Sequence, residues 1–221
     1  MDKERYIQVY QEKQNDLNHH LQNMEVIIKH NCNKYFEGNS MYEHCSFNRH
    51  PSLFNKQVNL FWVGTQGHLK MCEIGFNGGH SSLLMLLGRG DANIDYLVFD
   101  IVEHDYVKPC FEYVKTQFPS MRFEMIEGDS IQNMPNWISN HKDQIETFDV
   151  VHVDGGHSDE CIKNDMINAN KLVKKGGIVI IDDTDAPQIN KYVDFYLQMG
   201  GFEEIDILPT PMYSHRMIRK L

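Results

Sequence analysis

The chain has 221 residues, of which 41% are hydrophobic and 24% charged, as is typical of a single soluble globular domain. Its net charge of −10 and its lack of a Lys/Arg cluster argue against a nucleic-acid partner, and no apolar run approaches the roughly 18 residues that a membrane span needs. A mixed-charge N-terminus and five cysteines without CxxC spacing lead us to expect a cytoplasmic protein with reduced thiols.

The N-terminal residues 2–30 predict a helix, because Leu17, Leu21, Met24 and Ile28 recur at helical spacing. Such a helix packs either on its own domain or on a second subunit, so a homo-oligomer through this helix is one expectation. The following residues, 31–51, have no periodicity and predict a loop. We therefore divide the chain into an N-terminal helix and loop, 1–51, which serve as a lid or in oligomerisation, and a main domain, 52–221.

The main domain alternates between strand-like and helix-like segments. The strand candidates are residues 69–76, 94–101, 121–127, 148–154 and 177–183, and the helix candidates between them are 79–89, 105–118, 130–141 and 158–175. This alternation predicts a doubly wound α/β fold with a mostly parallel sheet. A further helix, 187–199, precedes strand candidates 202–209 and 212–221, which a short proline-containing turn would join as an antiparallel pair at the sheet edge.

Acidic residues lie at or just after the carboxyl ends of the predicted strands. They are Glu73, Asp100, Asp129, Asp154, Asp182 and Asp183. Ligands bind at the carboxyl ends of strands in an open parallel sheet, so we expect a binding site at this rim.

The turn after the first strand, EIGFNGGHSS, carries neither the lysine of a phosphate-binding loop nor the GxGxxG pattern of dinucleotide-binding proteins. What remains is an ExGxxxG pattern, in which glycines let the backbone approach a ligand and Glu73 offers it a carboxylate. Asp100 ends the second strand, where an acidic residue commonly accepts hydrogen bonds from ribose hydroxyls. The alternative role for Asp100 is a helix N-cap.

Three segments, EIGFNGGHSS, VFD and IEGDS, resemble motifs of the class I S-adenosylmethionine-dependent methyltransferases. The resemblance implies their Rossmann-like fold, with a seven-stranded sheet that ends in an antiparallel strand pair. It implies that the first motif surrounds the methionine and ribose of the cofactor, that Asp100 holds the ribose hydroxyls, and that Asp129 and Ser130 lie beside the adenine. The expected cofactor-binding set is Glu73, Gly75, Asn77, Gly79, Ser81, Asp100, Asp129, Ser130 and Asp154.

Asp154, Asp182 and Asp183 end neighbouring strands, so we expect their carboxylates to lie close together. Like charges at that distance repel unless they are protonated or bridged by a cation, and Mg²⁺ prefers carboxylate ligands. A bound divalent metal would lower the pKa of a substrate hydroxyl, and His157 would be the base that removes its proton. The alternatives are that Asp183 caps a turn and that His157 is a turn residue before the N-cap Ser158. We further expect His152 to be a core histidine. His80 lies at a predicted helix start and is a candidate for contact with the cofactor carboxylate.

The segments DGGH and IDDT resemble the metal-dependent O-methyltransferases of the macrocin and mycinamicin sugar type more closely than the catechol and caffeoyl-CoA type. The resemblance implies transfer of a methyl group from S-adenosylmethionine, with Mg²⁺ or another divalent cation, to a hydroxyl of a small molecule. A sugar or nucleotide sugar is the first choice of acceptor, and a catechol-like phenol the second. Two other hypotheses are a non-catalytic S-adenosylmethionine-binding module and a metal-independent transferase acting on nitrogen.

Overall fold

A seven-stranded sheet forms the centre of the protein in the computed structural model, which describes residues 2–32, 51–90, 92–212 and 214–221. The strands are β1 (Lys70–Ile74), β2 (Asp95–Asp100), β3 (Arg122–Glu127), β4 (Phe148–Val153), β5 (Val173–Ile181), β6 (Phe202–Glu204) and β7 (Arg216–Lys220), in the spatial order β3-β2-β1-β4-β5-β7-β6. The first five are parallel, and β7 runs antiparallel to β5 and β6. The predicted doubly wound fold is confirmed.

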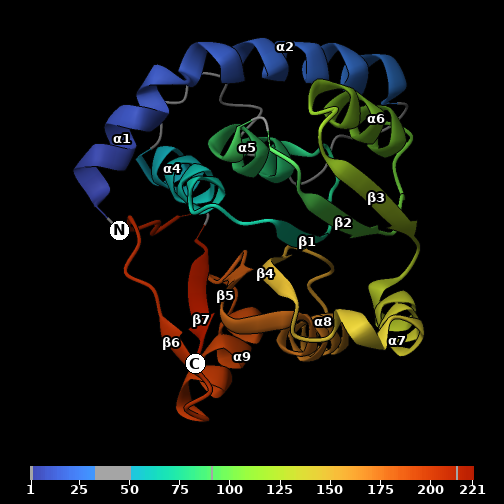
Figure 1. Ribbon diagram of the computed structural model, residues 1–221, viewed down its shortest axis with the longest axis vertical. Helices are drawn as coiled ribbons and strands as arrows, with labels where there is room; N and C mark the ends of the chain where they lie inside the picture. Colours follow the sequence, from blue (N-terminus) through green and yellow to red (C-terminus); the bar gives the residue numbers. More distant parts are fainter. Residues whose placement is uncertain (1, 33–50, 91, 213) are drawn as a thin grey trace.

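Helices cover both faces of the sheet (Figure 1). One face carries α4 (Pro51–Thr65), α5 (His80–Arg89) and α6 (Val107–Gln117), and the other carries α7 (Ser130–Asn140), α8 (Asp159–Leu172) and α9 (Pro187–Gln198). A short 3₁₀ helix, Lys142–Gln144, precedes β4. Each face has its own hydrophobic core, and the strand order reverses between β1 and β4, which is where ligands bind in folds of this kind.

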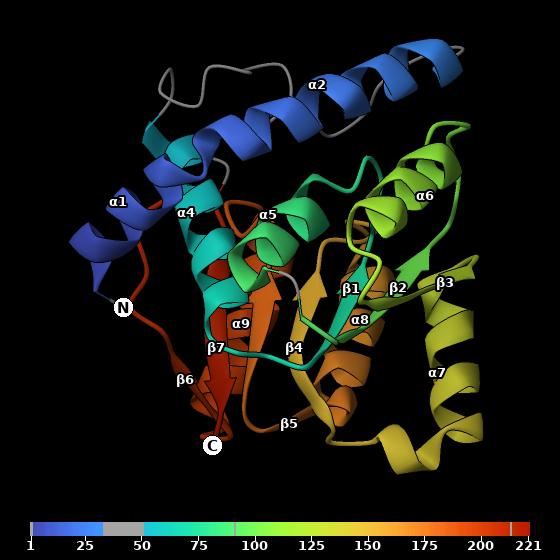
Figure 2. The same cartoon turned by 45° about the horizontal axis from the view of Figure 1, so that its top comes forward.

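The predicted N-terminal helix is two helices, α1 (Lys3–Glu12) and α2 (Gln14–Asn31), which meet at Lys13. The break lets α1 pack on α4 while α2 crosses α5 and α6 (Figure 2). The predicted apolar face, Leu17, Leu21, Met24 and Ile28, is at most 4% exposed and belongs to the core that α4, α5 and α6 share. This face therefore packs on its own chain. Residues 33–50, which carry most of the predicted loop, lie outside the described residues.

One connection differs from the sequence prediction, and one helix lies where the sequence analysis predicted no element. The strand pair β6 and β7 exists, but the segment 205–215 joins it instead of a short turn. Pro209 and Pro211 lie in this segment and have no N–H to donate to a strand ladder. In addition, α4 is buried along most of its length, so it has no polar stripe by which periodicity could reveal it. Within the described residues no helix is long and apolar enough to cross a membrane.

Candidate active site

A cavity of about 450 Å³ lies at the carboxyl ends of β1, β2 and β4, at the point where the strand order reverses. Its volume falls within the range of ~300–1,000 Å³ that is usual for small-molecule sites. The predicted site residues that line it are Gly75, Asn77, Asp100, Asp129, Ser130, Asp154, His157 and Asp183. The lining does not include Glu73, Gly79, Ser81 or Asp182. It also includes Glu103 and His104, which the sequence analysis did not single out.

The turn after β1 explains the first glycine of the motif. Gly75 has φ +85°, and a Cβ atom on it would lie 2.0 Å from the carbonyl oxygen of Asp154. No other residue fits this position, because a side chain would be strained and would push the turn away from β4. Gly75 therefore keeps the β1 and β4 walls of the cavity in contact.

Asp100 holds the same turn through its carboxylate. The Oδ2 atom accepts hydrogen bonds from the amides of Phe76 (2.7 Å) and Asn77 (2.9 Å), and Oδ1 accepts one from the amide of Val102 (2.6 Å). An ionised carboxylate has about four acceptor positions, so roughly one remains for a ligand hydroxyl. Asp100 lines the cavity as predicted, and the structure adds a role in holding the turn.

Glu73 is 1% exposed and hydrogen-bonded inside the protein. Its carboxylate accepts from Ser82 Oγ, from Tyr96 Oη at 3.1 Å and from His152 Nδ1 at 2.9 Å. Burial alone would lower the pKa of His152, but the hydrogen bond and charge of Glu73 outweigh it and raise that pKa. All three partners of Glu73 are side chains of the protein itself, and Glu73 does not line the cavity. The structure therefore does not place it where the predicted contact with a cofactor would need it.

Two other predicted positions lie at the start of α5, outside the cavity lining. Gly79 has φ +79° and its Cα lies against the ring of Phe76, while Ser81 is buried. His80, between them, is 4% exposed, and burial lowers its pKa to about 3. His80 is therefore neutral at physiological pH, and it is not among the residues that line the cavity.

The three aspartates predicted as metal ligands do not form one group. His152, Asp154 and Asp182 each offer an atom within 4.8 Å of the other two, whereas Asp183 is not in this cluster. The Asp183 carboxylate instead lies 2.9 Å from His157 Nε2. Asp183 follows Asp182 directly and has φ +51°, so the two side chains leave the backbone in different directions. The prediction of three clustered aspartates is corrected in this respect: His152 takes the place expected for Asp183.

A lysine that the sequence analysis missed reaches this cluster from α4. Lys56 Nζ lies 2.5 Å from Asp182 Oδ2, and the two side chains are 6% and 4% exposed. Burial would lower the pKa of Lys56, but Asp182, Asp154 and Asp183 outweigh it and raise that pKa. Lys56 in turn holds the pKa of Asp182 below its ordinary value, against the effect of burial. The Lys56 ammonium group therefore supplies positive charge beside Asp182, where the sequence analysis expected a metal ion.

Asp154 differs from Asp182 although the two belong to one cluster. Burial and the neighbouring Asp182 raise the pKa of Asp154 well above its ordinary value. A nitrogen ligand and two carboxylates are suitable donors for a divalent metal. However, the Lys56 ammonium group already lies against one of the two carboxylates, so a divalent ion does not fit the cluster as it is arranged here.

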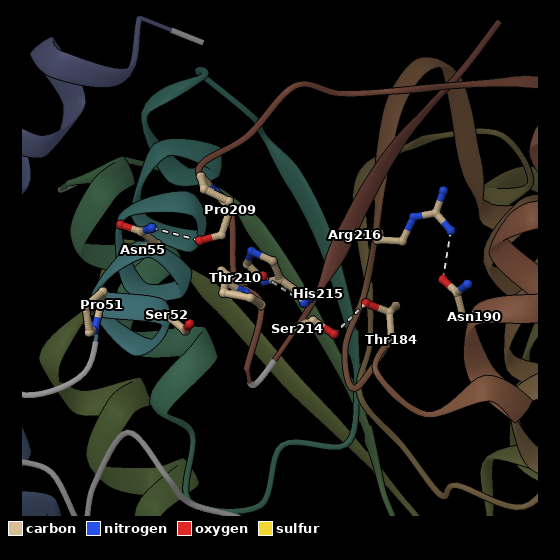
Figure 3. Close-up of a pocket in the computed structure, with 11 residues that line it drawn as sticks. Pro51, Ser52, Asn55, Thr184, Asn190, Pro209, Thr210, Ser214, His215 and Arg216 are labelled. Carbon is tan, nitrogen blue, oxygen red and sulfur yellow. Dashed lines mark hydrogen bonds between the residues drawn. The ribbon is translucent and has the colours of Figure 1, made fainter.

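A second cavity, of about 570 Å³, lies between α4, the segment after β5 and the segment 205–215 (Figure 3). Its described lining is Pro51, Ser52, Asn55, Thr184, Asn190, Pro209, Thr210, Pro211, Ser214, His215 and Arg216. Asn55 donates a hydrogen bond to the carbonyl of Pro209 (2.7 Å), and Thr184 to Ser214 (3.2 Å). Asp183 lines the first cavity, and the next residue, Thr184, lines the second.

Comparison with known proteins agrees with this geometry. Residues 72–184, half of the chain, match the family described as "Methyltransferase domain", and no curated protein sequence matches the chain. Among solved structures, an O-methyltransferase from Bacillus cereus in complex with SAH has a TM-score of 0.62 at 16% identity, with 90% of each chain covered. CalS11, a TDP-rhamnose 3′-O-methyltransferase of calicheamicin biosynthesis, has a TM-score of 0.61 at 15% identity, with 91% of this chain and 93% of that chain covered.

A third similar structure is SAH-bound PaMTH1 from Podospora anserina, with a TM-score of 0.56 at 15% identity; 89% of this chain and 93% of that chain are covered. Identities this low show a shared fold. The family match extends from Cys72, within β1, to Thr184, and so includes every strand end that lines the first cavity. The chain therefore belongs to the methyltransferase domain family and has the fold of the class I methyltransferases.

Proposed function

We propose that the protein transfers a methyl group from S-adenosylmethionine to a hydroxyl group of a small, neutral molecule such as a sugar. One observation carries this proposal: the first cavity brings the glycine turn and Asp100 together with Asp154, His157 and Asp183. A cofactor subsite and an acid–base pair on one cavity are what such a transfer requires. Three of the similar structures described above hold SAH or carry the name O-methyltransferase, which is consistent with this reaction.

S-adenosylmethionine would supply a methyl group on a positively charged sulfur. Asp100 has room for one hydrogen bond from a ribose hydroxyl, and Gly75 keeps the backbone close enough for the ligand to lie against it. Asp129 caps α7 through the amide of Ile131, and it lies on the cavity wall with Ser130 on the side where the resemblance places the adenine. The exposed side chain of Ile101 adds apolar surface to the same cavity.

His157 and Asp183 would handle the proton of the acceptor. When the methyl carbon leaves sulfur and bonds to the acceptor oxygen, the hydroxyl proton must go to a base, and the imidazole of His157 can take this role. The Asp183 carboxylate, 2.9 Å from Nε2, stabilises the imidazolium that forms. A non-catalytic binding module would have no use for this pair on the cavity wall.

The second cavity is our candidate for the acceptor subsite. Its hydroxyl and amide side chains suit hydroxylated molecules, and its described lining contains no Phe, Tyr or Trp to stack on a phenol. Its one guanidinium, that of Arg216, already pairs with Glu204 at 2.7 Å and Asp194 at 2.6 Å, so it is poorly placed for a phosphate. These contacts favour a sugar over both the phenol and the nucleotide sugar. The divalent-metal dependence expected from the sequence stays a prediction, and the position of Lys56 argues against it.

The test combines ligand binding with turnover. S-adenosylmethionine should raise the melting temperature of the protein, because a ligand that binds only the folded state stabilises it. Incubation with hydroxylated acceptors should then give products heavier by one methyl group in mass spectrometry. His157→Ala should keep the thermal shift and lower turnover by about 10²–10⁴-fold, the usual contribution of a general base.

The matched control is His141→Ala, since His141 is exposed and its ring contacts Trp137 at the end of α7, through a hydrogen bond to the Trp137 carbonyl and by stacking on the indole. It should behave as the wild type in both measurements. Full turnover in His157→Ala would remove the proposed base, and the absence of any thermal shift with S-adenosylmethionine would remove the proposed function.

A further inference from the structure

One lysine of α4 is buried at the carboxyl end of the sheet. Lys56 is 5% exposed, and its ammonium group lies 2.5 Å from Asp182 Oδ2. Long charged side chains are almost never this deeply buried unless they are paired. Removing such a group from water is costly, so its position needs a reason other than helix formation.

The helix that carries Lys56 is fixed on both sides of it. Asn55 donates to the carbonyl of Pro209 (2.7 Å), and Asn59 exchanges two hydrogen bonds with the backbone of Leu208, at 2.9 and 3.0 Å. On the neighbouring position, Gln57 accepts a hydrogen bond from the buried Tyr10 hydroxyl at 2.7 Å. Lys56 is therefore held against Asp182 by the surrounding structure, and it is not a surface side chain that happens to fold inward.

The charges around this point match one another without a metal ion. The Lys56 ammonium group lies against Asp182, and His152 Nδ1 lies 2.9 Å from Glu73, so both nitrogen groups have a carboxylate partner within the protein. The ligand atoms of His152, Asp154 and Asp182 lie within 4.8 Å of one another, so an ion bound between them would share Asp182 with the ammonium group. Two cations at that separation repel each other strongly in a buried site.

We propose that the Lys56 ammonium group is the resident cation of this site, in the place where a divalent metal ion is expected from the resemblance to metal-dependent O-methyltransferases. The protein then binds divalent ions weakly and transfers the methyl group without them. This inference rests on the proposed function for the location of the reaction. Its principal measurement, metal binding, does not depend on turnover.

The experiment measures Mn²⁺ binding to the full chain by electron paramagnetic resonance, together with the metal content of the purified protein. The wild type should contain no stoichiometric divalent metal and should bind Mn²⁺ weakly. Lys56→Met removes the ammonium group and keeps most of the apolar stem. It frees the Asp182 carboxylate beside His152 and Asp154 and removes a competing positive charge, so Mn²⁺ should bind at least about tenfold more tightly than to the wild type.

The matched control is Lys174→Met. Lys174 also pairs with an aspartate, Asp149, but at the amino end of β4, on the opposite edge of the sheet. Its Mn²⁺ affinity should equal that of the wild type. A role of Lys56 in folding alone would lower the stability of Lys56→Met and leave its Mn²⁺ affinity unchanged.

Three results would overturn the inference: one equivalent of divalent metal in the purified wild type, loss of methyl transfer on treatment with EDTA that Mg²⁺ restores, or unchanged Mn²⁺ affinity in folded Lys56→Met. If Lys56→Met does not fold, the metal content of the wild type and its response to EDTA test the inference. A wild type that is metal-free and also transfers no methyl group to any acceptor refutes the proposed function and leaves Lys56 as the resident cation. The two failures are thus distinguishable.

Discussion

Asp182 and Asp183 are neighbours in the chain, yet their carboxylates have different partners. Asp182 pairs with the buried Lys56, and Asp183 pairs with the partly exposed His157 on the cavity wall. The sequence shows that both lie at a strand end, and consecutive residues of a strand are known to face opposite ways. It does not show which partner each one meets, because Lys56 comes from a distant helix that the hydrophobic periodicity does not reveal.

Gly75 provides a test at the level of a single backbone position. Gly75→Ala places a Cβ atom 2.0 Å from the Asp154 carbonyl oxygen and gives a non-glycine residue a φ of +85°. The turn must move away from β4, so we expect the affinity for S-adenosylmethionine to fall by at least about tenfold, on the order of 1.4 kcal/mol. Isothermal titration calorimetry would measure it.

Gly67→Ala is the control for backbone strain alone. Gly67 has φ +78°, close to that of Gly75, but a Cβ atom there would have nothing within 4 Å. This variant should lose about 1 kcal/mol of stability and keep its affinity for the cofactor. Equal affinities in the two variants would show that the close approach to Asp154 does not shape the cavity.

The helices and strands of the main domain follow their predicted positions within a few residues. Apolar runs predict β1, β2 and β4, which are buried on both faces, and the edge strand β3, which is partly exposed, together with the helices between them. The exceptions are elements whose limits depend on distant contacts: α4, the break between α1 and α2, and the long segment before β7. The strand pair at the sheet edge is predicted, but the length of its connection is set by the cavity-lining prolines.

Helix α2 allows a stability test of the predicted apolar face. Met24 is fully buried in the core shared with α5 and α6, so Met24→Ala should lower the free energy of unfolding by about 2–5 kcal/mol. Val26 lies on the same helix but is 68% exposed, and Val26→Ala should change stability by no more than about 0.5 kcal/mol. Urea denaturation would measure both. Similar small losses would mean that α2 is not part of the folded core.

The burial of this face also bears on the predicted homo-oligomer. Because Leu17, Leu21, Met24 and Ile28 are covered by their own chain, an interface on α2 would have to use its polar side. Oligomerisation through the N-terminal helix remains a prediction, as do the lid role of residues 1–51 and the cytoplasmic location.

The molecule as a whole carries more acidic than basic groups, and its stability should depend on pH through buried histidines. Burial lowers the pKa of His80 and of His215 to about 3 each. Below pH ~6.5 the unfolded chain takes up protons on these rings while the folded protein does not, so acid lowers the stability. The stability that these neutral rings contribute is fully present above pH ~6.5 and is lost as the pH falls toward 3.

His80→Gln isolates this contribution. At pH 5 one such buried neutral ring lowers the free energy of unfolding by about 2 kcal/mol. Between pH 8 and pH 5 the free energy of unfolding of the wild type should therefore fall by about 2 kcal/mol more than that of His80→Gln. Urea denaturation at both pH values gives the comparison. The other buried histidines, including His152 with its raised pKa, are common to both proteins and cancel. Parallel losses in the two proteins would mean that His80 is protonated in the folded state.

The amino-acid sequence by itself determined the succession of strands and helices from β1 to α9, the glycine turn after β1, and the rim of the sheet on which the acidic residues lie. These features are local, because periodicity, a tight turn and a strand end are each written in a few consecutive residues. Only the tertiary structure decided which charges meet. Glu73 turned inward to His152, Asp183 turned to His157, and Lys56 reached Asp182, since the partner of a buried charge is chosen by the packing of elements that are far apart in the chain.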